Sequence, residues 1–194
     1  MTKILILDNY DSFTYNLFHQ VKELCTHEVT VCKNDEISVE AVNGYDWIIL
    51  SPGPGLPRDA GIMPQLISKY SSSKKILGVC LGHQAIAEAF GGELINTEVF
   101  HGVSTPVYYN DGAEMFKGLA NPFEAGRYHS WMVSERNFPI DLEVTARDEK
   151  DNIMALSHRT FAVTGVQFHP ESIMTTEGRK ILLNWIKTPE RKQV

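Results

Sequence analysis

Hydrophobic and polar positions follow two different periods in the first half of the chain. Short apolar runs predict strands that are buried on both faces, as in a parallel sheet, at residues 3–7, 29–32, 47–50 and 76–79. Between these runs, apolar residues recur at helical spacing, which predicts helices over residues 13–24, 62–70 and 83–90. Ser12 stands where the N-cap of the first helix is expected.

The second half of the chain is richer in strand patterns. Strands are predicted over residues 93–97, 105–109, 123–128, 142–146, 153–157 and 161–168, and a last helix over 176–186. Strands that alternate with helices predict an α/β fold. We expect a mostly parallel, doubly wound sheet flanked by helices, with an additional smaller antiparallel β portion. A single domain is expected over residues 1–188, followed by a polar tail over 189–194.

Composition and charge exclude several function classes. The chain has 24 acidic against 18 basic residues, a formal net charge of −6, which argues against nucleic-acid and anionic membrane surfaces as partners. No apolar run approaches the roughly 20 residues that cross a bilayer, and the first residues lack the pattern of a secretory signal. The 3 cysteines form no disulfide framework, so a cytoplasmic location is expected.

Cys80 is the candidate nucleophile. Residues 78–82 read G-x-C-x-G between a predicted strand and a predicted helix, as in the nucleophile elbow of serine hydrolases. The helix N-terminus favours a thiolate there, and the N–H of Leu81 is placed to hold an oxyanion. The alternative, a buried structural cysteine, is the interpretation favoured for Cys25 and Cys32.

His169 is the candidate general base. Pro170 disfavours helix at His169, and in an extended segment residues i and i+2 project to the same side. Glu171 is therefore placed to accept a hydrogen bond from one ring nitrogen while the other faces a nucleophile. Without Cys80 the pair would be better explained as exposed turn residues. With it, the pattern favours a Cys-His-Glu triad.

A rigid loop over residues 51–55 (SPGPG) directly follows a predicted strand. Its prolines restrict the backbone and its glycines allow a substrate to approach it, with N–H groups at Gly53 and Gly55. Gly53 is the second candidate oxyanion donor. Asp8, this loop and Cys80 all follow predicted strands, and ligands of α/β sheets bind beyond the carboxyl ends of strands.

Three motifs together carry a family resemblance. Residues 51–55, 78–84 (GVCLGHQ) and 165–171 (GVQFHPE) resemble the class I, or triad, glutamine amidotransferases. Residues 8–13 (DNYDSF) and 127–130 (RYHS) are similar to those of the small glutaminase subunits of anthranilate synthase and aminodeoxychorismate synthase. The resemblance covers nearly the whole chain.

The resemblance implies a role for particular residues. The triad would be Cys80, His169 and Glu171. The residues that bind glutamine and its oxyanion, through main-chain or side-chain groups, would be Gly53, Pro54, Gly55, Leu81, Gln84, Ser130 and Trp131.

Two positions depart from the family pattern. The family usually has Leu where this chain has Trp131, a change that a main-chain contact would survive. It often has Lys where this chain has Val103, which would alter partner contact or local charge.

The implied activity is hydrolysis of L-glutamine, with ammonia passed to a larger chorismate-binding synthase subunit. No cofactor or metal is expected in this subunit, whereas the partner subunit in this family uses Mg²⁺. The anthranilate and the p-aminobenzoate pathways, or both, remain open, because the partner decides the product. A non-catalytic binding subunit is the alternative from a different class, and a peptidase of the α/β-hydrolase kind is disfavoured by the spacing of His169 and Glu171.

Overall fold

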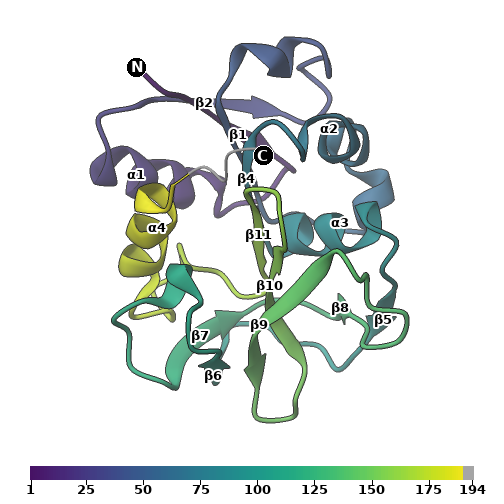
Figure 1. Cartoon of the computed structure of the whole chain (residues 1–194), viewed down its shortest axis with the longest axis vertical. Coiled ribbons are helices and arrows are strands. Elements are labelled where there is room, and N and C mark those ends of the chain that lie inside the picture. Colours follow the sequence, from purple (N-terminus) through teal and green to yellow (C-terminus); the bar gives the residue numbers. More distant parts are fainter. Residues whose placement is uncertain (190–194) are drawn as a thin grey trace.

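The parallel half of the main sheet is built from five strands. A computed structural model describes residues 1–189 of the chain, and in this part the main sheet has nine strands in the order β2-β1-β3-β4-β11-β10-β9-β6-β7 (Figure 1). The parallel strands are β1 (Lys3–Asp8), β2 (Glu28–Lys33), β3 (Trp47–Leu50), β4 (Lys75–Val79) and β11 (Val163–Val166).

The antiparallel half continues the same sheet beyond β11. It comprises β10 (Ile153–His158), β9 (Leu142–Asp148), β6 (Val103–Tyr109) and β7 (Phe123–Arg127). A separate two-stranded sheet pairs β5 (Leu94–Asn96) with β8 (Trp131–Val133). The predicted α/β class, with a parallel and an antiparallel portion, is confirmed. Strand β8 was not predicted, because its three residues (WMV) show no alternation of apolar and polar positions.

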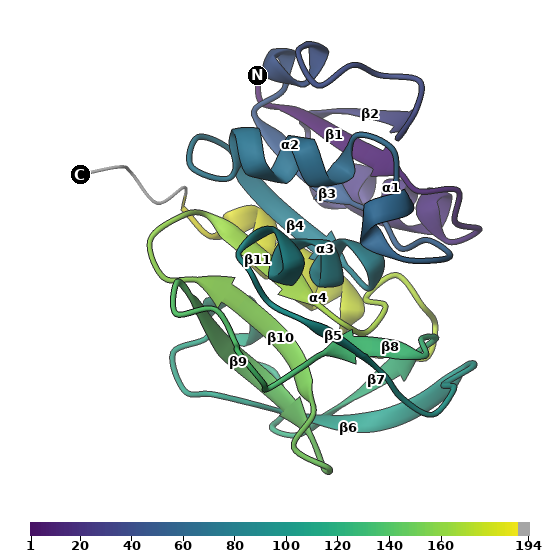
Figure 2. The same ribbon diagram turned by 90° about the vertical axis from the view of Figure 1, so that its right-hand side faces the viewer.

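Helices cover both faces of the parallel half (Figure 2). Alternation along β1 divides the core: Ile4 and Ile6 contribute to one apolar cluster, and Leu5 and Leu7 to the other. The first cluster includes α1 (Thr14–Leu24) and α4 (Gly178–Lys187), and the second α2 (Met63–Tyr70) and α3 (Leu81–Ala89). Short 3₁₀ turns lie at η1 (Ala41–Gly44), η2 (Pro57–Asp59) and η3 (Glu114–Phe116).

The expected cap of the first helix is wrong. No side chain caps the helix at its N-cap position, which is Phe13 and not Ser12. The turn before α1 is closed instead by two carboxylates: Asp11 accepts from the N–H of Phe13 at 2.7 Å, and Asp8 accepts from the hydroxyl of Thr14 at 2.8 Å. Local Asx bonding therefore starts the helix two residues later than Ser12.

The C-terminal region is described only in part. Helix α4 ends at Lys187, and the predicted tail, apart from Pro189, lies outside the described residues. Within residues 1–189, no helix has the length and apolarity needed to cross a membrane.

The turn between β4 and α3 depends on two glycines. A Cβ added at Gly78 would lie 2.4 Å from the carbonyl oxygen of Gly82, and one added at Gly82 would lie 2.5 Å from that of Leu50. Both neighbours are backbone atoms, so neither contact is relieved by a side-chain rotation. This close approach brings α3 directly onto the ends of β3 and β4.

Gly78→Ala is expected to lower the free energy of unfolding by about 1–3 kcal/mol or more, because the new methyl group must push two backbone segments apart. Gly44 is exposed and has no atom within 4 Å of an added Cβ, so Gly44→Ala should stay within about 0.5 kcal/mol of the parent. Urea unfolding of both variants measures the difference. Equal stabilities would contradict this account of the turn.

His83 is fully buried on α3, beneath the turn. Both ring nitrogens lack a hydrogen-bond partner among the described residues, and Gly165 of β11 leaves room for the ring, since an added Cβ there would approach the Nδ1 atom at 2.8 Å. Burial lowers the pKa of His83 to about 3. Between pH 3 and 6.5 the unfolded chain therefore binds a proton at this residue that the native chain does not, and stability falls as pH falls.

His83→Asn is expected to flatten the dependence of stability on pH. Between pH 6 and pH 5 the parent should lose about 1.2 kcal/mol more unfolding free energy than this variant. His101 is exposed, so His101→Asn supplies the matched control and should retain the parental slope. Denaturant unfolding at several pH values measures the slopes, and identical slopes for His83→Asn and the parent would contradict the burial argument.

Candidate active site

Cys80 occupies a strained position at the end of β4. Its φ angle is 52°, in the left-handed region that costs energy for any residue but glycine, and it is the N-cap residue of α3. The backbone N–H of Cys80 donates to the carbonyl of Val166 on β11 at 2.8 Å. The side chain is nearly buried, with the residue 6% exposed. Strain at this point places the sulfur at the N-terminus of α3, where helix N–H groups favour negative charge.

His169 and Glu171 follow strand β11 and contact one another. The Nδ1 atom of His169 lies 2.7 Å from a carboxylate oxygen of Glu171, and both residues are buried. The backbone N–H of His169 donates to the carbonyl of Gly126 at 3.0 Å, which holds the loop against β7. The hydrogen bond that the i, i+2 spacing predicts is therefore present. Because Glu171 accepts at Nδ1, the Nε2 atom is the ring nitrogen left for the nucleophile.

The electrostatics of His169 link it to Cys80. Burial alone would lower the pKa of His169, but the charge and a hydrogen bond of the Cys80 sulfur, together with Glu171, raise that pKa well above its usual 6.5. The Nε2 atom is buried and makes no well-aligned hydrogen bond in the described residues. The sulfur of Cys80 and the carboxylate of Glu171 therefore both act on the charge of one imidazole.

Two aromatic rings hold the imidazole in place. Phe13 and Tyr128 pack edge-on against His169, with ring centroids 5.6 and 4.9 Å from that of the imidazole. The hydroxyl groups of Tyr128 and Ser172 lie 3.0 Å apart, which ties this wall to the loop that carries Glu171. Both residues stand in motifs of the family resemblance, at 8–13 and 127–130, but their contacts with His169 arise only from the fold.

The loop after β3 is held by side-chain amides. The backbone N–H of Asn9 donates to the hydroxyl of Ser51 at 2.8 Å, and the Asn9 amide donates to the carbonyl of Ser51 at 2.9 Å. Asn34 donates to the oxygen of the Asn9 side chain at 3.0 Å. These bonds join the ends of β1, β2 and β3, so the loop is rigid at its base.

Gly53 lies between Asn9 and Leu81. A Cβ added at Gly53 would come within 2.6 Å of the Cβ of Asn9 and 2.8 Å of a methyl group of Leu81. The two residues predicted as oxyanion donors therefore lie side by side next to Cys80. Pro54 and Gly55 are exposed at the tip of the loop, where Gly55 has a φ of 79°.

Gln84 is bound to the protein rather than free. Its amide nitrogen donates to the main-chain carbonyl of Trp131 at 2.8 Å and to the side-chain oxygen of Gln167 at 3.2 Å. The amide of Gln167 lies 3.6 Å from the sulfur of Cys80. Gln167 was not predicted as a site residue, although it stands in the motif that contains His169, two residues before it.

Trp131 begins the short strand β8, and Ser130 directly precedes it. The carbonyl of Ser130 accepts from the N–H of Thr97 at 2.8 Å and from the amide of Asn96 at 3.0 Å. The side chains of Ser130 and Trp131 are half-buried, and the group of Trp131 that the network uses is its carbonyl, which any residue provides. Val103, the other departure, is 43% exposed at the start of β6.

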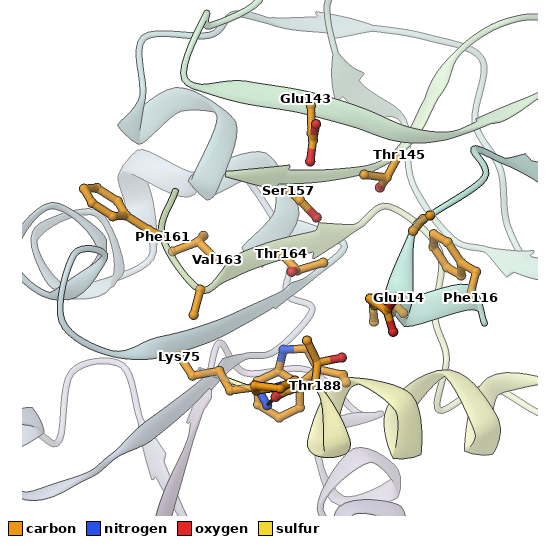
Figure 3. A pocket seen from close by; sticks show the side chains of 16 residues that line it. Lys75, Glu114, Phe116, Glu143, Thr145, Ser157, Phe161, Val163, Thr164 and Thr188 are labelled. Atoms are coloured by element: carbon orange, nitrogen blue, oxygen red, sulfur yellow. Dashed lines mark hydrogen bonds between the residues drawn. The ribbon is translucent and has the colours of Figure 1, made fainter. Parts of the chain in front are cut away.

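The cavity shown in Figure 3 lies elsewhere. It measures about 340 Å³ and is lined by Lys75 and Val163, which begin β4 and β11, and by Thr145 and Ser157 of the antiparallel half. Cys80 follows the opposite end of β4, so this cavity is not part of the candidate active site. Across residues 1–189, no three His, Cys, Asp or Glu side chains gather in a way that would hold a metal ion.

The arrangement has the parts that acyl transfer requires. It has a thiol at a helix N-terminus, an imidazole hydrogen-bonded to a carboxylate, and two neighbouring residues, Gly53 and Leu81, next to the thiol. Groups placed in this way can form a thioester with an acyl substrate. Cys25 and Cys32 are also free thiols and are half-buried.

Comparison with known proteins agrees with this geometry. The family described as "Glutamine amidotransferase class-I" matches residues 5–188. The chain is 45% identical to anthranilate synthase component 2 of Pseudomonas aeruginosa, over 95% of this chain and 94% of that protein. It is 44% identical to aminodeoxychorismate/anthranilate synthase component 2 of Bacillus subtilis, over 98% of each.

A solved structure shares the fold. The crystal structure of a glutamine amidotransferase from Thermotoga maritima superimposes with a TM-score of 0.76 at 12% identity, covering 96% of each chain. With most of the chain matched by the family and both relatives well above 30% identity, the protein belongs to the class-I glutamine amidotransferases and is a glutamine amidotransferase enzyme.

Proposed function

We propose that this chain is the glutaminase subunit of anthranilate synthase, which releases ammonia from L-glutamine for a chorismate-binding partner subunit. The observation that carries the proposal is the pairing of His169 with Glu171 at 2.7 Å, next to the sulfur of Cys80 on the β4–α3 turn. The names of the relatives from Pseudomonas aeruginosa and Bacillus subtilis support the choice of synthase.

In the first half-reaction the Cys80 thiolate attacks the side-chain carbonyl carbon of glutamine. The tetrahedral oxyanion is held by the N–H groups of Leu81 and Gly53. Loss of one such donor typically costs about 3–4 kcal/mol of transition-state stabilisation. Protonated His169 gives its proton to the departing nitrogen, so that ammonia leaves and a γ-glutamyl thioester remains on Cys80.

In the second half-reaction water attacks the thioester carbonyl carbon. His169 accepts a proton from this water, the C–S bond breaks, and the products are glutamate and the free thiolate. Glu171 stabilises the imidazolium in both steps and keeps its ring in one orientation. No metal is required of this subunit in the proposed reaction. In the complex, Mg²⁺ would belong to the partner.

The substrate would be held beside the sulfur by the loop after β3 and by the start of β8. We assign Gln84, Ser130 and Trp131 to the grip on glutamine, with the main chain of the last two near its α-carboxylate and amine. Gly53, Pro54 and Gly55 would line the opposite side. The sulfur of Cys80 must stay reduced to act as a nucleophile, so the protein would work in a reducing compartment such as the cytoplasm.

Cys80→Ala in the complex with the partner subunit is expected to reduce glutamine-dependent product formation by about 10³-fold or more, because no other group can form the thioester. Product formation from added ammonium should persist, since it bypasses glutamine hydrolysis. Cys25→Ala is the matched control and should retain activity. Unchanged glutamine-dependent activity in Cys80→Ala would show instead a non-catalytic binding subunit.

The isolated chain is expected to be a poor glutaminase. Cys80, His169 and Glu171 are exposed by only 6, 2 and 3%, so substrate access depends on a rearrangement that a partner can induce. Ammonia released into water is also protonated near neutral pH, which favours transfer inside a complex. Glutamate release should rise about tenfold or more on adding the partner, and equal rates with and without it would contradict this expectation.

A second candidate is the glutaminase subunit of aminodeoxychorismate synthase, or one subunit that serves both synthases. The name of the Bacillus subtilis relative, which includes both synthases, supports this second candidate. Glutamine chemistry is the same in both cases, so the native complex has to be purified and supplied with chorismate and glutamine. Formation of the ortho aminobenzoate supports the first candidate, and formation of the para isomer supports the second.

A further inference from the structure

A buried ion pair lies outside the triad, between β7 and β9. The guanidinium of Arg127 donates through Nη1 to a carboxylate oxygen of Asp148 at 2.7 Å, and the two side chains are 2 and 4% exposed. Asp148 also accepts from the N–H groups of Lys150 and Asn152 and from the Asn152 amide, each at 2.9 Å. The carboxylate is thus saturated with donors and holds the guanidinium in one orientation.

Stability alone does not account for this pair. The free energy lost when two charges are removed from water can equal or exceed the free energy gained from their attraction. Buried apolar pairs of similar volume are often at least as stabilising. The Nη2 atom of Arg127 is buried without a hydrogen-bond partner in the described residues, which adds to the cost. The guanidinium lies 3.7 Å from the ring centroid of Phe100, so its plane is fixed on a second side. We infer from this cost that the function of the protein requires the Arg127 guanidinium to have a fixed orientation.

The fixed guanidinium determines the protonation of His129. The Nε atom of Arg127 donates to the Nε2 atom of His129 at 3.1 Å. Because arginine can only donate, Nε2 is the unprotonated nitrogen and Nδ1 carries the hydrogen. The Nδ1 atom lies 2.9 Å from the carbonyl oxygen of Trp131 and therefore donates to it. Burial and then the charge of Arg127 lower the pKa of His129 to about 3, so the ring is neutral and retains this tautomer.

The chain of hydrogen bonds ends on main-chain atoms that the proposed function assigns to the substrate. The carbonyl of Trp131 is held by His129 and Gln84, and the carbonyl of Ser130 by Thr97 and Asn96. A peptide unit is planar, so fixing two successive carbonyls also fixes the directions of the adjoining N–H groups. The main chain of residues 130–131 is thereby fixed before any substrate arrives.

We propose that Arg127 and Asp148 are positioning residues for glutamine binding: through His129 they fix the direction of the Ser130–Trp131 main chain, and thereby the affinity for the substrate. This inference rests on the proposed function, because it assigns the same two main-chain positions to glutamine. It adds the role of an ion pair that makes no contact with the triad.

The test is Arg127→Lys in the complex with the partner subunit. A lysine retains the charge opposite Asp148 but cannot donate to Asp148 and His129 in the same fork geometry. The KM for glutamine should rise roughly tenfold to hundredfold. The kcat should stay within about twofold, because Gln84 and Gln167 still connect the Trp131 carbonyl with Cys80.

Arg147→Lys is the matched control. Arg147 precedes Asp148 on the same strand and pairs with Glu135 and Asp151 at the surface, so the same substitution there should leave KM and kcat unchanged. The ¹⁵N chemical shifts of the imidazole give a second readout that does not depend on any variant. In the parent protein, His129 should carry its proton on Nδ1.

The outcomes separate this inference from the proposed function. A parent complex without glutaminase activity would overturn the proposed function itself. An active parent whose KM for glutamine is the same in Arg127→Lys, or whose kcat alone falls, would overturn only the positioning role. Proton occupancy on Nε2 of His129 in the parent would overturn it as well, even if Arg127→Lys fails to fold.

Discussion

The turn between β4 and α3 leaves no space for a side chain at either of its glycines, and the candidate active site depends on that constraint. Gly78 contacts the backbone of Gly82, and Gly82 contacts the backbone of Leu50. Helix α3 can therefore begin immediately after the strand, and Cys80 is left in a left-handed conformation with φ of 52°. A wider turn would relieve this strain and move the sulfur away from the helix N-terminus and from Gln167.

The parts of the site that could be predicted from the sequence are those encoded within a few residues. The position of Cys80 on the turn between β4 and α3 was visible because glycines flank it at a predicted strand-to-helix junction. The bond between His169 and Glu171 was visible because an extended backbone places i and i+2 on one side. The α/β class was likewise visible from short apolar runs, since β1, β3 and β4 are buried along most of their length.

The parts that could not be predicted depend on contacts across the fold. Arg127 and Asp148 come from different strands, and no local pattern pairs them before β6 is known to lie between β7 and β9. The cap at Ser12 was wrong because Asp8 and Asp11 organise the turn before α1, through the hydroxyl of Thr14 and the N–H of Phe13. Strand β8 is defined by its pairing with β5, and this pairing cannot be predicted from the three residues of β8 alone.

Strands β4 and β11 are adjacent and parallel, and this has a consequence for how the fold can diversify. Cys80 follows Val79 directly and His169 lies three residues after Val166, and these two valines are opposite one another in the ladder, so both residues lie at the same end of adjacent strands about 4.8 Å apart. The intervening chain forms the antiparallel half and the strands β5 and β8. Insertions or altered contacts there can change the surface of the antiparallel half while Cys80 and His169 still follow adjacent strands.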